Sequence, residues 1–180
     1  FLTTFLFSEI INKIEVSCNQ RISKDTISVL GGIKVGEDFD NNKMNTSLKE
    51  LYKTNFFSDV KINLMNGSLS ILVIENPIIE DIEFTGMKSE DFLDNLSKDV
   101  VLKNRMSFTE DQLQKDITLI KNILKSSGFY FANVESSLVT NKELNSVRIK
   151  LNIDKGEKAR IKKISFIGNK QVKDKKLLEV

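Results

Sequence analysis

The sequence predicts an α+β fold of tandem small domains, in each of which two helices cover one face of a three-stranded mixed sheet. Three observations lead to this prediction. A short strand motif recurs along the chain, helical periodicity follows each of its first two copies, and an alternating hairpin closes each unit. We expect a first domain at 10–77, a second at 78–157 and the start of a truncated third at 158–180.

The strand motif has isoleucine at its first and fourth positions, an apolar residue at its sixth, and a turn after it. Its copies lie at 11–19, 79–87 and 161–169. β-Branched and aromatic residues favour a strand, while glycine and asparagine favour the turn. Strand alternation does not account for the first isoleucine, which we expect to pack where the linker enters.

Two helices are predicted after each of the first two motif copies. In the first unit Ser23 is placed to cap a short helix, and Asp40 precedes a longer one. In the second unit Ser89 begins a short helix, and Thr109 and Gln112 form a capping box for a longer one. The long helices carry apolar stripes: Met44, Leu48, Leu51 and Tyr52 in the first, and Leu113, Ile117, Ile120 and Leu124 in the second.

A hairpin is predicted after each long helix. In the first unit Val60, Ile62 and Leu64 alternate with polar residues, and Asn66-Gly67 is the favoured type I′ turn. In the second unit 134–140 and 147–153 are the two strands. We therefore expect two separate cores, one with Leu48, Leu51, Ile62 and Leu72 and the other with Leu113, Ile117, Ile120 and Leu151.

The composition excludes several kinds of site. The chain has no histidine and a single cysteine, Cys18, which excludes an internal disulfide, a histidine-dependent catalytic site and a Cys/His zinc site. The carboxylates of Glu80 and Asp81 point to opposite faces of a strand, and those of Asp81 and Glu83 are expected to face solvent. We expect no enzymatic activity, no metal and no cofactor.

The charge distribution argues against a nucleic-acid-binding module. Residues 10–77 carry eight basic and eight acidic groups, residues 78–157 carry eleven and fourteen, and residues 158–180 carry eight and two. The predicted strand at 71–74 contains no aromatic residue. A nucleic-acid-binding sheet would need a basic surface and exposed aromatic residues, so we expect no nucleic-acid partner.

The N-terminal stretch is apolar up to Phe7 and then becomes polar. Residues 1–9 are the remnant of a secretory signal peptide, or else a short N-terminal strand or a disordered tail. No apolar run in the sequence reaches the about 20 residues that a membrane-spanning helix needs.

The strand–helix–helix–strand–strand order, together with the stretches at 19–23, 51–60 and 75–77, resembles POTRA domains. Over residues 10–180 the chain is similar to the periplasmic arm of outer-membrane protein assembly factors. Cys18 departs from the family pattern, which usually has glycine there, and this bears on the geometry of the turn.

This resemblance implies a place at the periplasmic face of a Gram-negative outer membrane. It implies unfolded outer-membrane proteins, periplasmic chaperones and accessory lipoproteins as partners, and contact with the membrane only through a C-terminal barrel that these 180 residues do not contain. The arm of a two-partner secretion transporter or a related translocation barrel is the alternative, because the same domains occur there.

The candidate binding site is the first strand of the first hairpin. Edge strands carry unpaired N–H and C=O groups that another chain can pair with, and the resemblance implies that the second strand of a domain binds extended client segments. The residues of this site are Val60, Lys61, Ile62, Asn63, Leu64 and Met65. On the alternative interpretation, Lys61 and Asn63 only keep an edge strand soluble.

Overall fold

The computed structural model describes residues 8–87, 89–161, 163–165, 167 and 176. The predictions for residues 1–7 and for most of residues 158–180 concern residues outside these ranges. Ile161 and residues 163–165 lie outside any strand. The strand expected in the third motif copy is therefore absent at these residues. A strand needs a partner for its backbone groups, and no described strand pairs with them.

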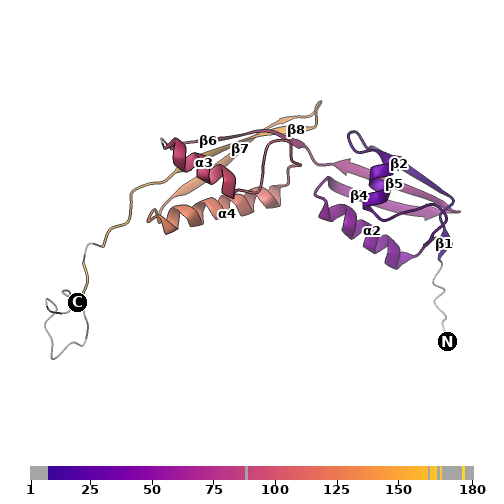
Figure 1. Cartoon of the computed structure of the whole chain (residues 1–180), viewed down its shortest axis with the longest axis horizontal. Coiled ribbons are helices and arrows are strands. Elements are labelled where there is room, and N and C mark those ends of the chain that lie inside the picture. Colours follow the sequence, from indigo (N-terminus) through magenta and orange to yellow (C-terminus); the bar gives the residue numbers. More distant parts are fainter. Residues whose placement is uncertain (1–7, 88, 162, 166, 168–175, 177–180) are drawn as a thin grey trace.

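The described residues form two units of the predicted order, which follow one another along the chain in Figure 1. The first unit comprises β1 (Glu9–Ile10), β2 (Lys13–Ser17), α1 (Lys24–Leu30), β3 (Asp38–Phe39), α2 (Asn41–Lys53), β4 (Phe57–Met65) and β5 (Ser68–Glu75). The second comprises β6 (Ile78–Thr85), α3 (Glu90–Asp99), α4 (Glu110–Ser126), β7 (Asn133–Asn141) and β8 (Ser146–Asp154).

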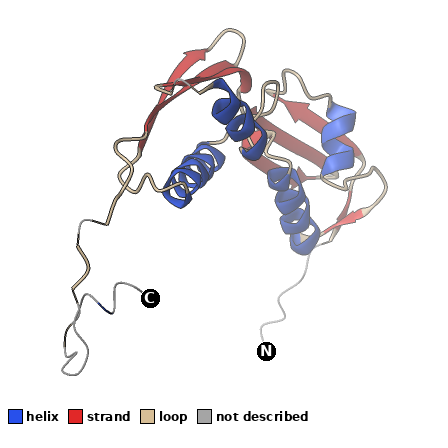
Figure 2. Ribbon diagram, turned by 60° about the vertical axis from the view of Figure 1, so that its left-hand side comes forward, coloured by secondary structure: helices blue, strands red, loops and turns tan. Residues whose placement is uncertain are grey.

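Both main sheets are mixed and have the last strand of their unit in the centre. The strand orders are β2-β5-β4 and β6-β8-β7, in which the motif strand is parallel to the central strand and the hairpin partner is antiparallel to it. Figure 2 shows the helices of each unit as a layer beside its sheet. The predicted α+β class is thus confirmed, with the small β1–β3 sheet as an unpredicted addition.

Each unit has its own hydrophobic core. Of the predicted members, Leu51 is buried in the first core and Leu48 and Ile62 pack against it, while all four predicted members of the second core are buried. Leu72 is the exception, because it is 36% exposed. Alternation along β5 turns Leu69, Ile71 and Val73 toward the helices and therefore Leu72 to the outer face.

A β-bulge explains the first isoleucine of the strand motif, for which we had expected a role at the linker. In the second unit the register shifts between Ile79 and Asp81, so one extra residue lets Ile79 and Ile82 both contact the core. In the first unit the N–H groups of Asn12 and Lys13 both donate to Gly67 O, at 2.7 and 3.1 Å. The buried Ile11 therefore reaches the same core as β2.

The predicted helix caps hold at three of four positions. Ser23, Asp40 and Thr109 each accept a hydrogen bond from a backbone N–H of the first helical turn, whereas Ser89 makes no such bond. The capping box at Thr109 is only half formed, because the Gln112 side chain donates to Asp116 instead.

The buried Asp116 of α4 binds the first residues of the loop between α3 and α4. Its carboxylate accepts hydrogen bonds from the N–H groups of Val101 and Leu102, at 3.1 and 2.8 Å. The start of the α3–α4 loop is therefore fixed to α4.

Cys18 adopts the backbone conformation that glycine would allow. Its φ is 63°, and Gly86 at the matching turn of the second unit has a φ of 89°. A side chain at such a φ costs roughly 1–2 kcal/mol because Cβ approaches the carbonyl oxygen. Cys18 thus keeps the turn conformation that Gly86 has in the second unit, at an energetic cost.

Replacing Cys18 by glycine should therefore stabilise the first unit. The Cys18→Gly variant should gain about 0.5–1 kcal/mol in the free energy of unfolding, the relief of strain less the greater freedom of glycine in the unfolded chain. Urea denaturation measures the change. Cys18→Ala keeps Cβ and is the control, so an equal gain in both variants would contradict the explanation.

Candidate peptide-binding strand and domain junction

The predicted binding residues 60–65 lie on an edge strand. β4 pairs with β5 on one side, and no described strand pairs with it on the other. Asn66 and Gly67 have φ values of 51° and 76°, as a type I′ turn requires, so the register follows from a two-residue loop that joins Met65 to Ser68.

This register decides which backbone groups of β4 are open. The residue pair that flanks a two-residue turn exchanges both hydrogen bonds, and the next pair exchanges none. Met65 and Ser68 are the flanking pair, so the N–H and C=O groups of Leu64, Ile62 and Val60 point away from β5. Lys61 and Asn63 use theirs within the sheet.

The hydroxyl of Tyr52 already occupies one of the outward groups. The N–H of Val60 donates to this hydroxyl at 3.1 Å, and the hydroxyl donates to Asp59 at 3.3 Å. Tyr52 lies on α2, so a helix side chain covers the beginning of the edge. The open donors on residues 60–65 are therefore the N–H groups of Ile62 and Leu64.

The side chains of β4 combine a packed face with a polar one. Val60 is buried and Ile62 and Leu64 pack against the core, whereas Lys61 and Asn63 are exposed. The Lys61 ammonium lies 3.7 Å from the Asp59 carboxylate, and the register of β4 is irregular between Phe57 and Asp59. Charged side chains and bulges both hinder the pairing of one edge strand with another. The β4 edge is therefore partly protected against aggregation.

The second unit offers an equivalent edge that the sequence analysis did not single out. β7 pairs with β8 and with no other described strand, and Val134 is its only buried residue. β7 has polar residues on both of its faces, so it lacks the alternation of apolar and polar residues that indicated β4. The internal repeat was the other signal: β7 occupies in the second unit the place that β4 has in the first.

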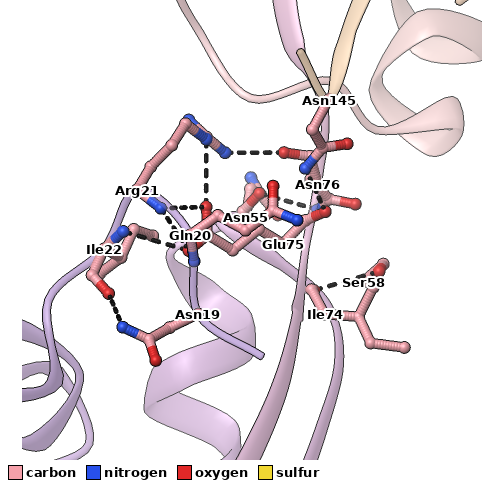
Figure 3. Close-up of polar contacts among 10 residues, drawn as sticks. All are labelled: Asn19, Gln20, Arg21, Ile22, Asn55, Ser58, Ile74, Glu75, Asn76 and Asn145. Carbon is pink, nitrogen blue, oxygen red and sulfur yellow. Dashed lines mark hydrogen bonds and ion pairs between the residues drawn. The ribbon is translucent and has the colours of Figure 1, made fainter. Parts of the chain in front are cut away.

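A buried carboxylate holds the C-terminal end of β5 to the loop after β2 (Figure 3). The Glu75 side chain is 1% exposed and lies 3.1 Å from Nε of Arg21. It also accepts backbone hydrogen bonds from Gln20, Arg21 and Ile22, at 2.8 to 3.2 Å. Several donors therefore compensate the charge where water does not reach it.

The same region joins the first unit to the second. The Arg21 guanidinium donates to Asn76 O at 2.8 Å, and the Asn76 amide donates to Asn55 O at 2.8 Å. From the second unit, Asn145 donates through its side chain to Glu75 O at 3.1 Å (Figure 3) and accepts from the N–H of Ile78 at 2.9 Å. The linker between β5 and β6, residues 76–77, is therefore bonded to the first unit, and the strand residues on either side of it are bonded to Asn145 of the second.

Two of the three acidic residues of β6 form ion pairs with β8, while Asp81 accepts a hydrogen bond from the Asn104 amide at 3.2 Å. Glu80 lies 2.7 Å from Arg148, and Glu83 lies 3.4 Å from Lys150. Hydrogen bonds from Ser146 and Arg148 hold the pKa of the Glu80 carboxyl below its usual value. Within the described ranges no cluster of three or more potential metal ligands occurs, and no helix there is long and apolar enough to cross a membrane.

Comparisons with known proteins point to one domain type. The POTRA family model, described as a surface antigen variable number repeat, matches residues 77–156. The N-terminal domain of Omp85 from Thermosynechococcus elongatus superimposes with a TM-score of 0.56 at 12% identity, over 83% of this chain and 63% of that one. At this identity the likeness shows the fold alone.

Two relatives are similar over almost the whole chain, and both are named outer membrane protein assembly factor BamA. The protein of Neorickettsia risticii is 28% identical over 182 residues, which cover 100% of this chain and 24% of the relative. The protein of Neisseria meningitidis serogroup B is 31% identical over 175 residues, which cover 93% and 21%. The chain thus spans less than a quarter of the length of these relatives.

Removal of the buried carboxylate should destabilise the first unit. The Glu75→Ala variant leaves three backbone donors and Arg21 without their acceptor, and it should lose about 3–5 kcal/mol in the free energy of unfolding. Urea denaturation followed by circular dichroism measures the loss. Glu50→Ala removes an exposed carboxylate paired with Lys53 and should cost less than about 1 kcal/mol, so similar losses would contradict the assignment.

Proposed function

We propose that the chain, whose residues 77–156 match the POTRA family model and whose two units share one fold, forms part of the periplasmic arm of an outer-membrane protein assembly factor. In this role it binds unfolded outer-membrane proteins by adding their extended segments to β4. The names of the two relatives support the assembly role. Periplasmic chaperones and accessory lipoproteins of the assembly complex are the further partners that we propose, at the periplasmic face of the outer membrane.

The observation that carries the proposal is the open edge at Ile62 and Leu64. Each residue offers one N–H and one C=O, so an added strand can form about four backbone hydrogen bonds at a net ~0.5–1.5 kcal/mol each. The cost of association consumes much of this gain. The resulting affinity is micromolar at best, which suits a protein that holds clients briefly and releases them.

Backbone recognition also suits a client with no fixed sequence. Main-chain hydrogen bonds give affinity to any extended segment, while selectivity needs pockets for alternate side chains. Lys61 and Asn63 are exposed polar residues on β4, which suits an added segment of any sequence. The arm of a two-partner secretion transporter remains the alternative, with less support because both relatives reported above carry the assembly-factor name.

Hydrogen exchange can test strand addition with residue resolution. In the free chain the Ile62 and Leu64 amides should exchange faster than those of Lys61 and Asn63, because only the latter donate to β5. An extended ten-residue peptide rich in valine and threonine should slow exchange at Ile62 and Leu64 and leave the other two unchanged. Exchange followed by NMR gives the measurement.

The control is the same peptide with every internal backbone nitrogen methylated, which removes the donors of both edges and places a methyl group where a partner strand would lie. It should give no protection at Ile62 and Leu64. The proposal would be contradicted if only helix amides were protected from exchange, or if both peptides protected Ile62 and Leu64 equally.

Removal of the Tyr52 hydroxyl should lengthen the open edge. The Tyr52→Phe variant frees the Val60 N–H, so the valine-rich peptide should gain one bond and bind about twofold to tenfold tighter. Tyr130→Phe is the control, because Tyr130 is exposed on the other unit. Unchanged affinity in Tyr52→Phe, measured by NMR titration, would show that added strands do not reach Val60.

A further inference from the structure

We propose that a pocket at the junction of the two units binds a protein segment that carries a carboxylate side chain beside an apolar one. This site goes beyond strand addition, because it recognises side chains and lies next to β4 rather than along it. The pocket has a volume of about 280 Å³ and takes its walls from both units.

Exposed apolar side chains form one part of the pocket. Phe56 comes from the first unit, directly before β4, while Val101 and Met106 come from the α3–α4 loop of the second. They are 38%, 51% and 42% exposed. Large apolar side chains gathered in a concavity, rather than scattered singly, mark an interaction site.

The charge of the pocket is positive. Arg21 and Arg105 line it, and no carboxylate does. Glu75 and Asn76 O already engage Arg21. Within the described part of the chain no carboxylate pairs with Arg105, which leaves its guanidinium as the group that an incoming anion would meet. A guanidinium binds a carboxylate through two parallel hydrogen bonds.

The backbone holds Arg105 in a fixed position. Its N–H donates to Ile79 O at 2.7 Å, Met106 O accepts from the N–H of Ile79 at 2.9 Å, and Phe108 donates to Pro77 O at 2.8 Å. Arg105 has a φ of 71°, a conformation that disfavours a side chain. Strained residues held by their surroundings concentrate at binding sites. Backbone hydrogen bonds to β6 and to Pro77 of the linker thus hold the loop in place.

The volume and the chemistry together indicate the occupant. About 280 Å³ is slightly below the ~300–1,000 Å³ of small-molecule sites, so the pocket accommodates one or two side chains of a longer chain. In an extended segment residues i and i+2 point to the same side. An Asp or Glu at one of these positions reaches Arg105, and an apolar residue at the other contacts Phe56 and Met106.

A pair of peptides tests the site on the full chain. One is a blocked nonapeptide with a central glutamate, phenylalanine two positions to either side and serine elsewhere, and the other has glutamine in place of the glutamate. The glutamate peptide should bind at least about tenfold tighter and shift the NMR signals of Phe56, Arg105 and Met106. Equal binding of the two peptides would overturn the proposal.

Two variants assign the difference to Arg105. Arg105→Gly removes the charge and fits the positive φ, so the loop keeps its conformation, while Arg105→Gln keeps a polar side chain. In both variants the glutamate peptide should bind only as tightly as the glutamine peptide does. The affinity for the glutamine peptide should not change. Lys121→Gln, an equal charge change on the exposed face of α4, should have no effect.

Three results would reject the pocket. They are a loss in Lys121→Gln equal to that in Arg105→Gly, full competition by sodium acetate at the peptide concentration, and peptide shifts confined to residues 60–65. The last result would leave strand addition at β4 standing, so failure of this site and failure of the proposed function are distinguishable.

Discussion

The first unit and its junction with the second depend on the compensation of a buried negative charge, that of Glu75. Glu75 ends the central strand of the first sheet, and its carboxylate collects the backbone donors of the loop that follows β2. Without those donors a charge in this position would strongly destabilise the folded state. The end of β5, the loop after β2 and Arg21 are therefore ordered together. The linker begins at the next residue and therefore leaves the first unit from a fixed point.

The proposed strand-addition site and the junction are joined through the same sheet. β5 pairs with β4 from Met65 to Phe57, with a register shift between Phe57 and Asp59. The strand that leaves Ile62 and Leu64 open therefore also holds the start of β4, next to Phe56, through its last residue Glu75. A client bound along β4 and a segment bound at the junction would then lie next to each other. Two weak contacts on adjacent surfaces can give useful affinity to a chain that satisfies both.

Local signals predicted the fold, and contacts distant in sequence decided what the prediction missed. Periodicity, caps and the Asn66-Gly67 turn gave the helices and hairpins, because each depends on neighbours within a few residues. The bulge after Ile79 and the outward turn of Leu72 depend on register against another strand. The edge at residues 60–65 was foreseeable, whereas the cover by Tyr52 was not, since nothing local marks a tyrosine as a partner of Val60.

The exposed turn at Cys18 has a practical consequence for observing the molecule. Cys18 is the only cysteine of the chain, and it lies two residues before the loop that Glu75 holds. Its side chain also lines a hollow shared with Lys142 and Asn145 of the second unit. A spin label attached to this thiol would broaden the NMR signals of nearby residues of the second unit, and it would thus report on the spacing of the two units without an engineered attachment point.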